Sequence, residues 1–267
     1  MTAIPPLGMG TFRLKGDSAY QSVNMALKTG FRHIDTAQMY GNESEVGRAI
    51  ADSGLARDEL FVTTKVWLDN LSQDRFLDSV QDSLARLGLE QVDLLLIHWP
   101  EKEGKVPMRE YLGELAKAQQ AGLARHIGVS NFTCQQIDEA LAILGDGALL
   151  TNQVEVHPYL QNRTLINHCQ QKGIAVTAYM PLAVGKVMDD ATLQKIAQKH
   201  QVTPAQVTLA WVLQQGLITI PSSTKQAHIE ANLAAAELTL DSDDMAAIAS
   251  LDSNERIADP DFAPAWD

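Results

Sequence analysis

The chain has 267 residues, and 33 acidic residues against 21 basic ones give it a formal net charge of −12. Its 45% hydrophobic and 20% charged residues are typical of a globular protein, and its length fits either one large α/β barrel or two ordinary domains. The acidic excess argues against a nucleic-acid or anionic-membrane partner, because both require a basic face, although it leaves room for a local phosphate-binding pocket.

Neither the cysteines nor the N-terminus indicates secretion or a membrane. Cys134 and Cys169 fall in helix-like segments without CxxC or metal-ligand spacing, so we expect two buried thiols in a reducing cytoplasm. The N-terminus has no basic region followed by a long apolar stretch, and the apolar run at 94–97 is too short to cross a bilayer. We therefore expect a cytoplasmic protein, and the acidic charge and the lack of an evident apolar surface stripe favour a monomer.

The first glycine-rich stretch, residues 8–13, only partly matches the GxGxxG fingerprint of dinucleotide-binding folds. Arg13 stands where the third glycine belongs, and no strong strand precedes Gly8. The sequence predicts a glycine-flanked turn or short strand there instead.

After this stretch, segments with strand and helix patterns alternate along the chain. Counting the opening segment, strands are predicted at 9–12, 31–35, 60–65, 92–97, 124–129, 150–156, 174–179 and 217–220. Helices are predicted at 18–28, 43–51, 72–87, 107–120, 133–144, 160–172, 191–200, 203–214, 227–236 and 242–251. Ser72 is the predicted N-cap of the third helix, and Gly88 its C-cap.

This alternation predicts the fold class. Strand and helix units at a spacing of about 30 residues indicate a parallel sheet, and short continuous apolar strands fit burial on both faces. Eight units with no linker between them favour a closed (β/α)8 TIM barrel with an extra C-terminal helix over an open doubly wound sheet. We expect a single domain that covers residues 1–267.

Polar residues close the predicted strands, where the active sites of such barrels lie. Each has an ordinary alternative, such as a solvated lysine, a core histidine or a packed tyrosine, but their occurrence on consecutive strands favours a site. The residues are Asp35, Lys65, His98, Ser130 and Asn131, Gln153 and Glu155, Tyr179, and the segment 221–224.

Tyr40 follows Asp35 by five residues and completes a set that suits carbonyl chemistry. A tyrosine has a reference pKa near 10, and a lysine cation within about 4–6 Å lowers it, so we expect Lys65 to make Tyr40 a general acid near neutral pH. Asp35 would keep Lys65 charged, and His98 would orient a carbonyl oxygen. Because no side chain donates hydride, this chemistry requires a cofactor.

In these residues and their contexts the chain resembles the aldo-keto reductase superfamily along nearly its whole length. Within it, the chain looks most like the short bacterial reductases of the 2,5-diketo-D-gluconate reductase type, with compact loops and the ending APAWD at 263–267. The motifs are FRHIDTAQMY at 31–40, TKVW at 64–67, LIHWP at 96–100, GVSNF at 128–132 and NQVEVHPY at 152–159.

The resemblance implies a role for each site residue. Tyr40 would be the proton donor, tuned by Lys65 and Asp35, with His98 orienting the carbonyl. The cofactor-binding residues would be Gly10, Thr11, Ser130, Asn131, Gln153, Tyr179, Pro181, Leu182, Ser222, Ser223, Thr224, Lys225, His228 and Asn232. Among these, Ser130, Asn131 and Gln153 would bind the nicotinamide carboxamide and Tyr179 would stack on its ring. Phe12, Trp67 and Trp99, with His98, would line the substrate pocket, although the three aromatic residues could also be ordinary core.

The segment expected to bind the adenosine phosphate departs from the family pattern. Ser222 stands where the family usually has a lysine, and His228 where it has an arginine. The segment 222–225 is expected to open a helix, whose N-terminus with its hydroxyls and Lys225 can still bind a 2′-phosphate. We therefore expect a preference for NADPH over NADH that is smaller than in relatives with both cations, with NADH tolerated.

Taken together, the sequence predicts an NADPH-dependent oxidoreductase that reduces small aldehydes, ketones and keto sugars, such as 2,5-diketo-D-gluconate or methylglyoxal-like compounds. A cofactor-binding redox sensor on the same scaffold is an alternative, because a fold does not fix a function. A barrel metal hydrolase is disfavoured and no metal is expected, because the histidines show no ligand grouping with acids. The physiological substrate stays open.

Overall fold

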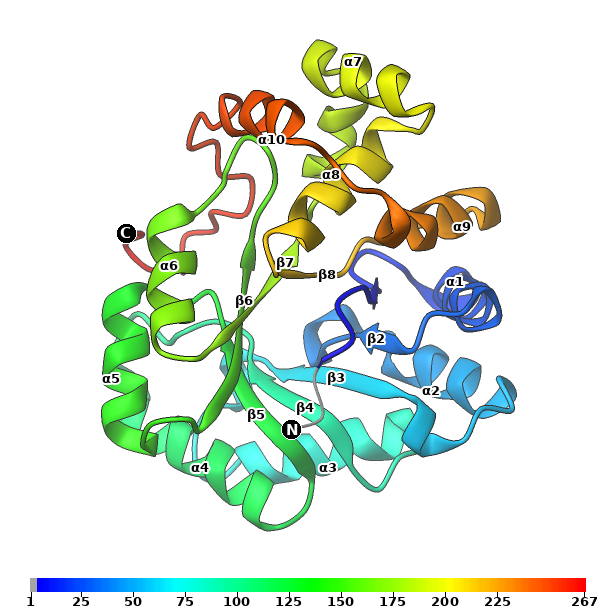
Figure 1. Ribbon diagram of the computed structural model, residues 1–267. Helices are drawn as coiled ribbons and strands as arrows, with labels where there is room; N and C mark the ends of the chain where they lie inside the picture. Colours follow the sequence, from blue (N-terminus) through cyan, green and yellow to red (C-terminus); the bar gives the residue numbers. More distant parts are fainter. Residues whose placement is uncertain (1–3) are drawn as a thin grey trace.

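The computed structural model describes residues 4–267, and these contain eight parallel strands paired in the order of the sequence (Figure 1). The last strand also meets the first, because Gly8 N donates to Thr219 O at 2.8 Å and Thr219 N donates to Pro6 O at 2.8 Å. The predicted (β/α)8 barrel is therefore confirmed. Its strands are β1 (Met9–Gly10), β2 (His33–Asp35), β3 (Phe61–Val66), β4 (Val92–Ile97), β5 (Ala124–Ser130), β6 (Leu149–Glu155), β7 (Ala175–Tyr179) and β8 (Ile218–Thr219).

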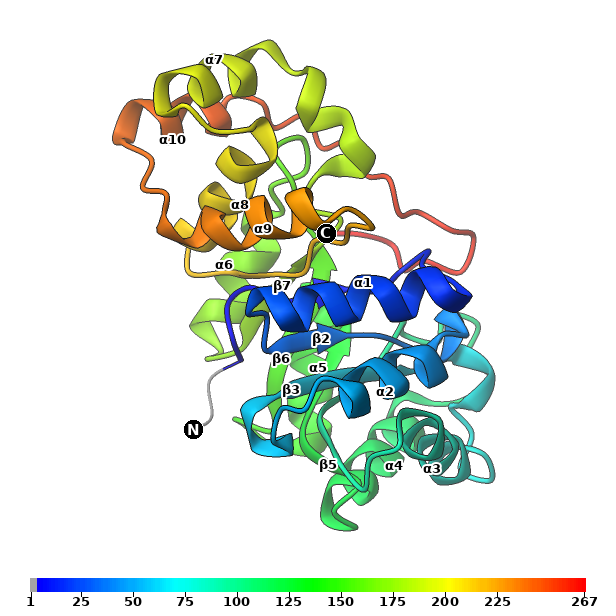
Figure 2. The same ribbon diagram turned by 90° about the vertical axis from the view of Figure 1, so that its right-hand side faces the viewer.

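The helices surround these strands, and α7 and α10 lie together at one end of the molecule (Figure 2). The predicted extra helix after the last barrel unit is α10. The helices are α1 (Gly16–Thr29), α2 (Glu43–Asp52), α3 (Phe76–Leu87), α4 (Met108–Gln120), α5 (Cys134–Leu144), α6 (Arg163–Gln171), α7 (Ala191–His200), α8 (Pro204–Gln214), α9 (Gln226–Ala234) and α10 (Ser242–Ala249).

Of the two predicted ends of α3, the structure confirms the C-terminal one and contradicts the N-terminal one. Gly88 follows the helix with φ 66°, the left-handed conformation that glycine adopts without strain, so its role as C-cap is confirmed. The start at Ser72 is wrong. The carbonyl of Ser72 accepts hydrogen bonds from Arg75 N at 3.0 Å and Phe76 N at 2.9 Å, which makes 72–75 a turn before the helix.

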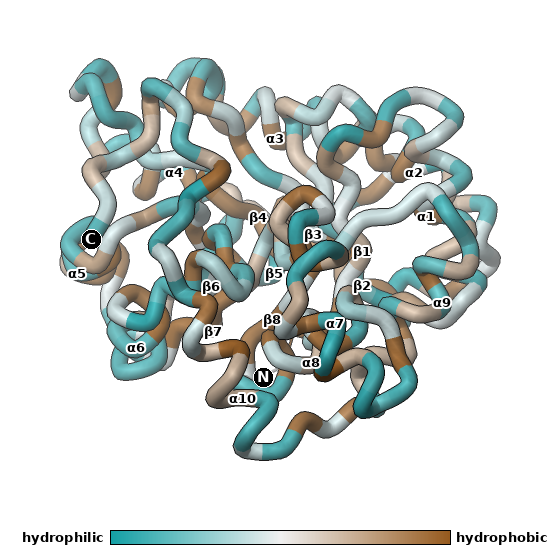
Figure 3. The backbone as a smooth tube through the Cα atoms, turned by 90° about the horizontal axis from the view of Figure 1, so that it is seen from above, coloured by the Kyte–Doolittle hydropathy of each residue, from teal (hydrophilic) through white to brown (hydrophobic). Residues whose placement is uncertain are grey.

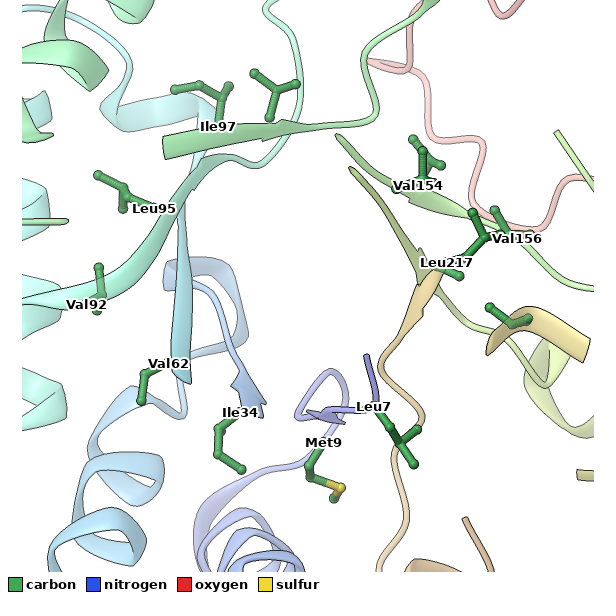
Figure 4. Close-up of a cluster of buried hydrophobic side chains, with 14 of the residues drawn as sticks. Leu7, Met9, Ile34, Val62, Val92, Leu95, Ile97, Val154, Val156 and Leu217 are labelled. Carbon is green, nitrogen blue, oxygen red and sulfur yellow. The ribbon is translucent and has the colours of Figure 1, made fainter. Parts of the chain in front are cut away.

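The core has two parts, because side chains alternate between the two faces of each strand. The larger part lies between strands and helices, and Figure 4 shows Val62, Leu95 and Ile97 among its members. Seen from above, the outer helices alternate between hydrophilic and hydrophobic stretches around the strands, as expected of helices with one buried face (Figure 3). The smaller part fills the inside of the barrel and consists of Ile4, Phe61, Leu94, Leu96 and Ile218.

The same alternation positions the site. Lys65 lies four residues after Phe61 and therefore shares its inward face on β3, and His98 follows Leu96 by two on the line of β4. The apolar residues inside the barrel thus give way to polar ones towards the carboxyl ends of the strands.

Further expectations concern thiols, membranes and metals. Cys169 is buried as predicted, but Cys134 is only half buried, because it opens the first turn of α5. The helices found in residues 4–267 are too short or too polar to span a membrane. Over the same part of the chain, no three His, Cys, Asp or Glu side chains are grouped so that they could hold a metal ion.

Candidate active site

A cavity of about 890 Å³ lies at the carboxyl ends of the strands, within the size range of small-molecule sites. It brings together side chains from most of the barrel units. Of the residues that the sequence singled out, it is lined by Gly10, Phe12, Asp35, Tyr40, Trp67, His98, Trp99, Ser130, Asn131, Gln153, Tyr179, Pro181, Leu182, Ser222, Ser223, His228 and Asn232.

Lys65 stands behind this wall and is completely buried. Its Nζ donates to Asp35 Oδ1 at 2.5 Å and to the carbonyl of Thr36 at 2.9 Å, and it lies 3.4 Å from the hydroxyl of Tyr40. A bare ammonium would be costly in this position, and the ion pair with Asp35 offsets that cost. The ammonium is therefore held within reach of the phenol.

Tyr40 ends a short 3-10 helix (Gln38–Tyr40) and is itself buried. Burial raises the pKa of its phenol well above the usual value of about 10, and the charge of Asp35 raises this pKa further. The expectation that Lys65 brings the pKa of Tyr40 down towards neutrality is opposite to this direction, which burial and the charge of Asp35 set. Tyr40 is a neutral phenol, the form that can donate a proton.

Lys65 shows the opposing effects of burial and pairing. Burial lowers the pKa of its ammonium, while the charge of Asp35 and its hydrogen bond raise it. The ion pair is what favours the charged form of this lysine.

His98 packs against Tyr40, with the two ring centroids 5.6 Å apart and edge to face. Burial lowers the pKa of its imidazole well below 6.5, and the charge of Lys65 lowers it further, so the ring is neutral. Its Nδ1 atom is buried and finds no hydrogen-bond partner within residues 4–267. A neutral imidazole carries one N–H donor, which suits it to orient an oxygen acceptor.

Polar side chains at the ends of β5, β6 and β7 hold one another in place. Asn131 Nδ2 donates to His98 O at 3.0 Å, and Tyr179 OH donates to Asn131 Oδ1 at 2.7 Å. Ser130 Oγ donates to Gln153 O at 2.7 Å. Gln153 Nε2 in turn donates to Asp35 Oδ2 at 2.8 Å, which ties this wall to the lysine pair. These hydrogen bonds link the side chains of the wall to one another.

Three predicted cofactor residues do not line the cavity. Thr11 is buried, and its hydroxyl donates to the carbonyl of Asp35 at 3.0 Å. Thr224 and Lys225 are exposed in the loop before α9, which begins at Gln226 rather than within 222–225. Lys225 still stands at the N-terminus of that helix, where its carbonyl accepts from His228 N at 3.0 Å.

The predicted substrate residues differ in exposure. Trp99 is buried, Trp67 is half buried and Phe12 is 37% exposed. All three line the cavity, which favours a role as its wall over one as ordinary core.

The sequence did not indicate the C-terminal part of the wall. The ring of Phe262 stands edge to face against Trp67 at 5.6 Å and Trp99 at 5.4 Å between centroids. This segment has no periodic pattern, and the single aromatic residue in the stretch 257–262 was its only signal. The missed lining residues include Arg13, Met39, Ile257, Ala258, Asp259, Pro260 and Phe262.

Comparison with known proteins gives a match to the model of the aldo/keto reductase family over residues 6–253. Methylglyoxal reductase DkgB of Escherichia coli O157:H7 is 49% identical over 266 residues, which cover 99% of this chain and 100% of that protein. Glyoxal reductase of Bacillus subtilis (strain 168) is 40% identical over 257 residues, covering 95% of this chain and 91% of that protein.

Solved structures give the same result. A candidate 2,5-diketo-D-gluconic acid reductase B has a TM-score of 0.95 and 44% identity, covering 99% of this chain and 94% of that chain. The aldo-keto reductase of Bombyx mori in complex with NADP has a TM-score of 0.89 and 36% identity, covering 98% of this chain and 95% of that chain.

Proposed function

Because this chain belongs to the aldo/keto reductase family, and is thus an oxidoreductase that acts on carbonyl groups, we propose that it reduces small aldehydes, ketones and keto sugars with NADPH. The observation that carries the proposal is the buried set of Lys65, Asp35, Tyr40 and His98, with the tyrosine and histidine on the wall of one cavity. Its substrates would be methylglyoxal-like compounds or 2,5-diketo-D-gluconate.

In this scheme Tyr40 gives its proton to the carbonyl oxygen. Its raised pKa keeps the phenol protonated until the carbonyl is in place, and the ammonium of Lys65 stabilises the phenolate that remains. His98 donates a hydrogen bond that orients the same oxygen. Asp35 holds Lys65 charged and in position throughout.

The shape and lining of the cavity fit a nicotinamide dinucleotide. The cavity extends from Tyr40 and His98 to Ser222 and Ser223, which precede α9, and to Asn232 within that helix, so one continuous space joins the proton donor to a helix N-terminus. When bound, the coenzyme supplies the hydride.

The ordered polar wall would receive the nicotinamide end. Ser130, Asn131 and Gln153 would bind the carboxamide, and the ring of Tyr179 would stack on the nicotinamide. Gly10, Thr11, Pro181 and Leu182 belong to the same proposed cofactor site; Gly10, Pro181 and Leu182 line the cavity, whereas Thr11 supports it from behind through Asp35.

At the phosphate end, the described surface is only weakly basic. Lys225 is exposed at the N-terminus of α9, whereas Ser222 carries no charge and His228 is an exposed imidazole. We expect NADPH to be preferred over NADH by a modest margin, because each charge-assisted phosphate hydrogen bond contributes about 1.5–3 kcal/mol. A preference for NADH, or one beyond about ten-thousandfold for NADPH, would contradict this assignment.

A panel of carbonyl compounds with both coenzymes tests the proposal. Methylglyoxal, 4-nitrobenzaldehyde and a keto sugar acid should each be reduced, with steady loss of NADPH absorbance. If NADPH binds but no member of the panel is turned over, the reductase proposal fails and the redox-sensor alternative is favoured.

A further inference from the structure

We propose that Glu155 is a positioning residue for the substrate side of the cavity. It fastens residues 252–267, called here the C-terminal strap, so that Phe262 stands against Trp67 and Trp99. The inference rests on the proposed function in so far as it takes this aromatic wall to be the side on which the carbonyl compound binds.

Glu155 is the last residue of β6, and its side chain is completely buried. Its Oε1 accepts hydrogen bonds from Ile257 N and from His157 Nε2, both at 2.8 Å. Its Oε2 accepts from Ala258 N at 2.7 Å. Two of the three donors therefore belong to the strap, and the carboxylate takes no part in the proton-transfer scheme.

The hydrogen-bond pattern suits a carboxylate, because both of its oxygens can accept. The backbone N–H of Tyr159 donates to His157 Nδ1 at 3.3 Å, so Nδ1 accepts, and in the neutral imidazole the proton lies on Nε2. Glu155 then faces three N–H donors. Glutamine would turn an NH2 group towards one or more of these donors, so Glu155→Gln disrupts the fastening while nearly preserving the size of the side chain.

Weaker fastenings hold the rest of the strap, which runs in red from α10 towards the side of α5 and α6 in Figure 1. Ser253 N and Glu255 N donate to the carbonyl of Tyr159 at 3.2 and 2.9 Å. The guanidinium of Arg256 lies 3.6 Å from the centroid of the Trp266 ring. The strap residues in these contacts are exposed or half buried, in contrast to the buried carboxylate of Glu155.

The point of attachment lies next to the residues that face the cavity. Ile257 and Ala258 line it themselves, and Phe262 follows four residues after Ala258. Phe262 is half buried, and Trp67 and Trp99 are the ring contacts that locate it. Loosening the C-terminal strap moves this wall but leaves Tyr40 and Lys65 in place. It should therefore raise KM and leave kcat nearly unchanged.

Besides the C-terminal strap, Tyr179 also connects Glu155 to the site. Glu155 is the Cα partner of Tyr179 on the neighbouring strand, and Tyr179 lies on the proposed coenzyme side. If Glu155 acted through Tyr179, its substitution would weaken NADPH binding. An action through the strap leaves the Kd for NADPH unchanged.

The first measurement is amide hydrogen exchange of residues 256–262 in the full chain without substrate. Exchange should be at least about tenfold faster in Glu155→Gln than in the wild type. Asp93→Asn is the matched control, because Asp93 is also a buried carboxylate that accepts from a backbone N–H, that of Val62 at 2.9 Å, but lies near the start of β4. Exchange in 256–262 should be unchanged in this control.

The second measurement is steady-state kinetics with 4-nitrobenzaldehyde. Glu155→Gln should raise KM about tenfold, with kcat and the Kd for NADPH within about twofold of wild type. In a Phe262→Ala background the same substitution should leave KM nearly unchanged, because the ring through which Glu155 acts is gone. Should Glu155→Gln fail to fold, Ala258→Pro removes one of the three donors at a half-exposed position and should show the same two effects.

Unchanged exchange in 256–262 would overturn the proposal, as would a loss of NADPH affinity or a KM effect that persists without Phe262. The exchange measurement needs no turnover. If the wild type reduces no carbonyl compound, the proposed function fails while the attachment of the strap by Glu155 is still tested.

Discussion

Replacing Lys65 by methionine separates the stability of the site from its chemistry. The substitution leaves the carboxylate of Asp35, which is 1% exposed, with the amide of Gln153 as its remaining side-chain partner. Removing one partner of a buried ion pair costs about 3–5 kcal/mol. For a chain of this length each kcal/mol lowers Tm by about 2–4 °C, so Lys65→Met should unfold roughly 6–20 °C below the wild type.

The double variant Asp35→Asn/Lys65→Met removes both charges and should recover most of that loss in Tm. Its activity should not recover. Without the ammonium nothing stabilises the phenolate of Tyr40, and kcat should stay at least about a hundredfold below wild type in both variants.

Thermal unfolding and NADPH oxidation on the same preparations provide the assay. A Lys65→Met variant with wild-type Tm and kcat would show that the ion pair matters neither for folding nor for proton transfer. Recovery of kcat in the double variant would contradict the role of the Lys65 ammonium in proton transfer, but not the cost of leaving the Asp35 carboxylate unpaired.

Two further predictions concern pH and the coenzyme. The kcat/KM for reduction should be nearly flat from about pH 6 to 8, because burial lowers the pKa of His98 well below 6.5 and raises that of Tyr40 well above 10; an inflection near pH 6.5 that disappears in His98→Gln would contradict the neutral imidazole. His228→Arg should raise kcat/KM with NADPH about tenfold while leaving that with NADH unchanged, since it adds a charge-assisted bond to the 2′-phosphate; an equal gain with both coenzymes would place residue 228 away from that phosphate.

Much of the fold was predictable because strand and helix periods alternate without interruption. The strand at 92–97 was predicted with the bounds that it has, since the continuous apolar run at 94–97 ends at the polar residue His98. The start of α3 was not predictable from composition. Ser72 suits an N-cap, but its carbonyl closes a turn that delays the helix to Phe76.

The site residues that close strands were predictable from the sequence. The features that depend on the depth of burial, or on contacts between residues far apart in the sequence, were not. Lys65 and His98 could be assigned to the site because they stand at the ends of consecutive predicted strands. The direction of the pKa shift of Tyr40 depends on how deeply the fold buries the phenol, which no local pattern records. Phe262 reaches the site through ring contacts with Trp67 and Trp99, far away in the sequence.

Tyr40→Phe shows whether the hydroxyl of Tyr40 delivers the proton to the carbonyl oxygen. We expect kcat to fall at least about a hundredfold, with the Kd for NADPH within about twofold of wild type. Tyr111→Phe, the same change at a buried position on α4 outside the cavity, should stay close to wild type in both quantities. If Tyr40→Phe kept kcat within a few-fold of wild type, a group other than Tyr40 would be the proton donor.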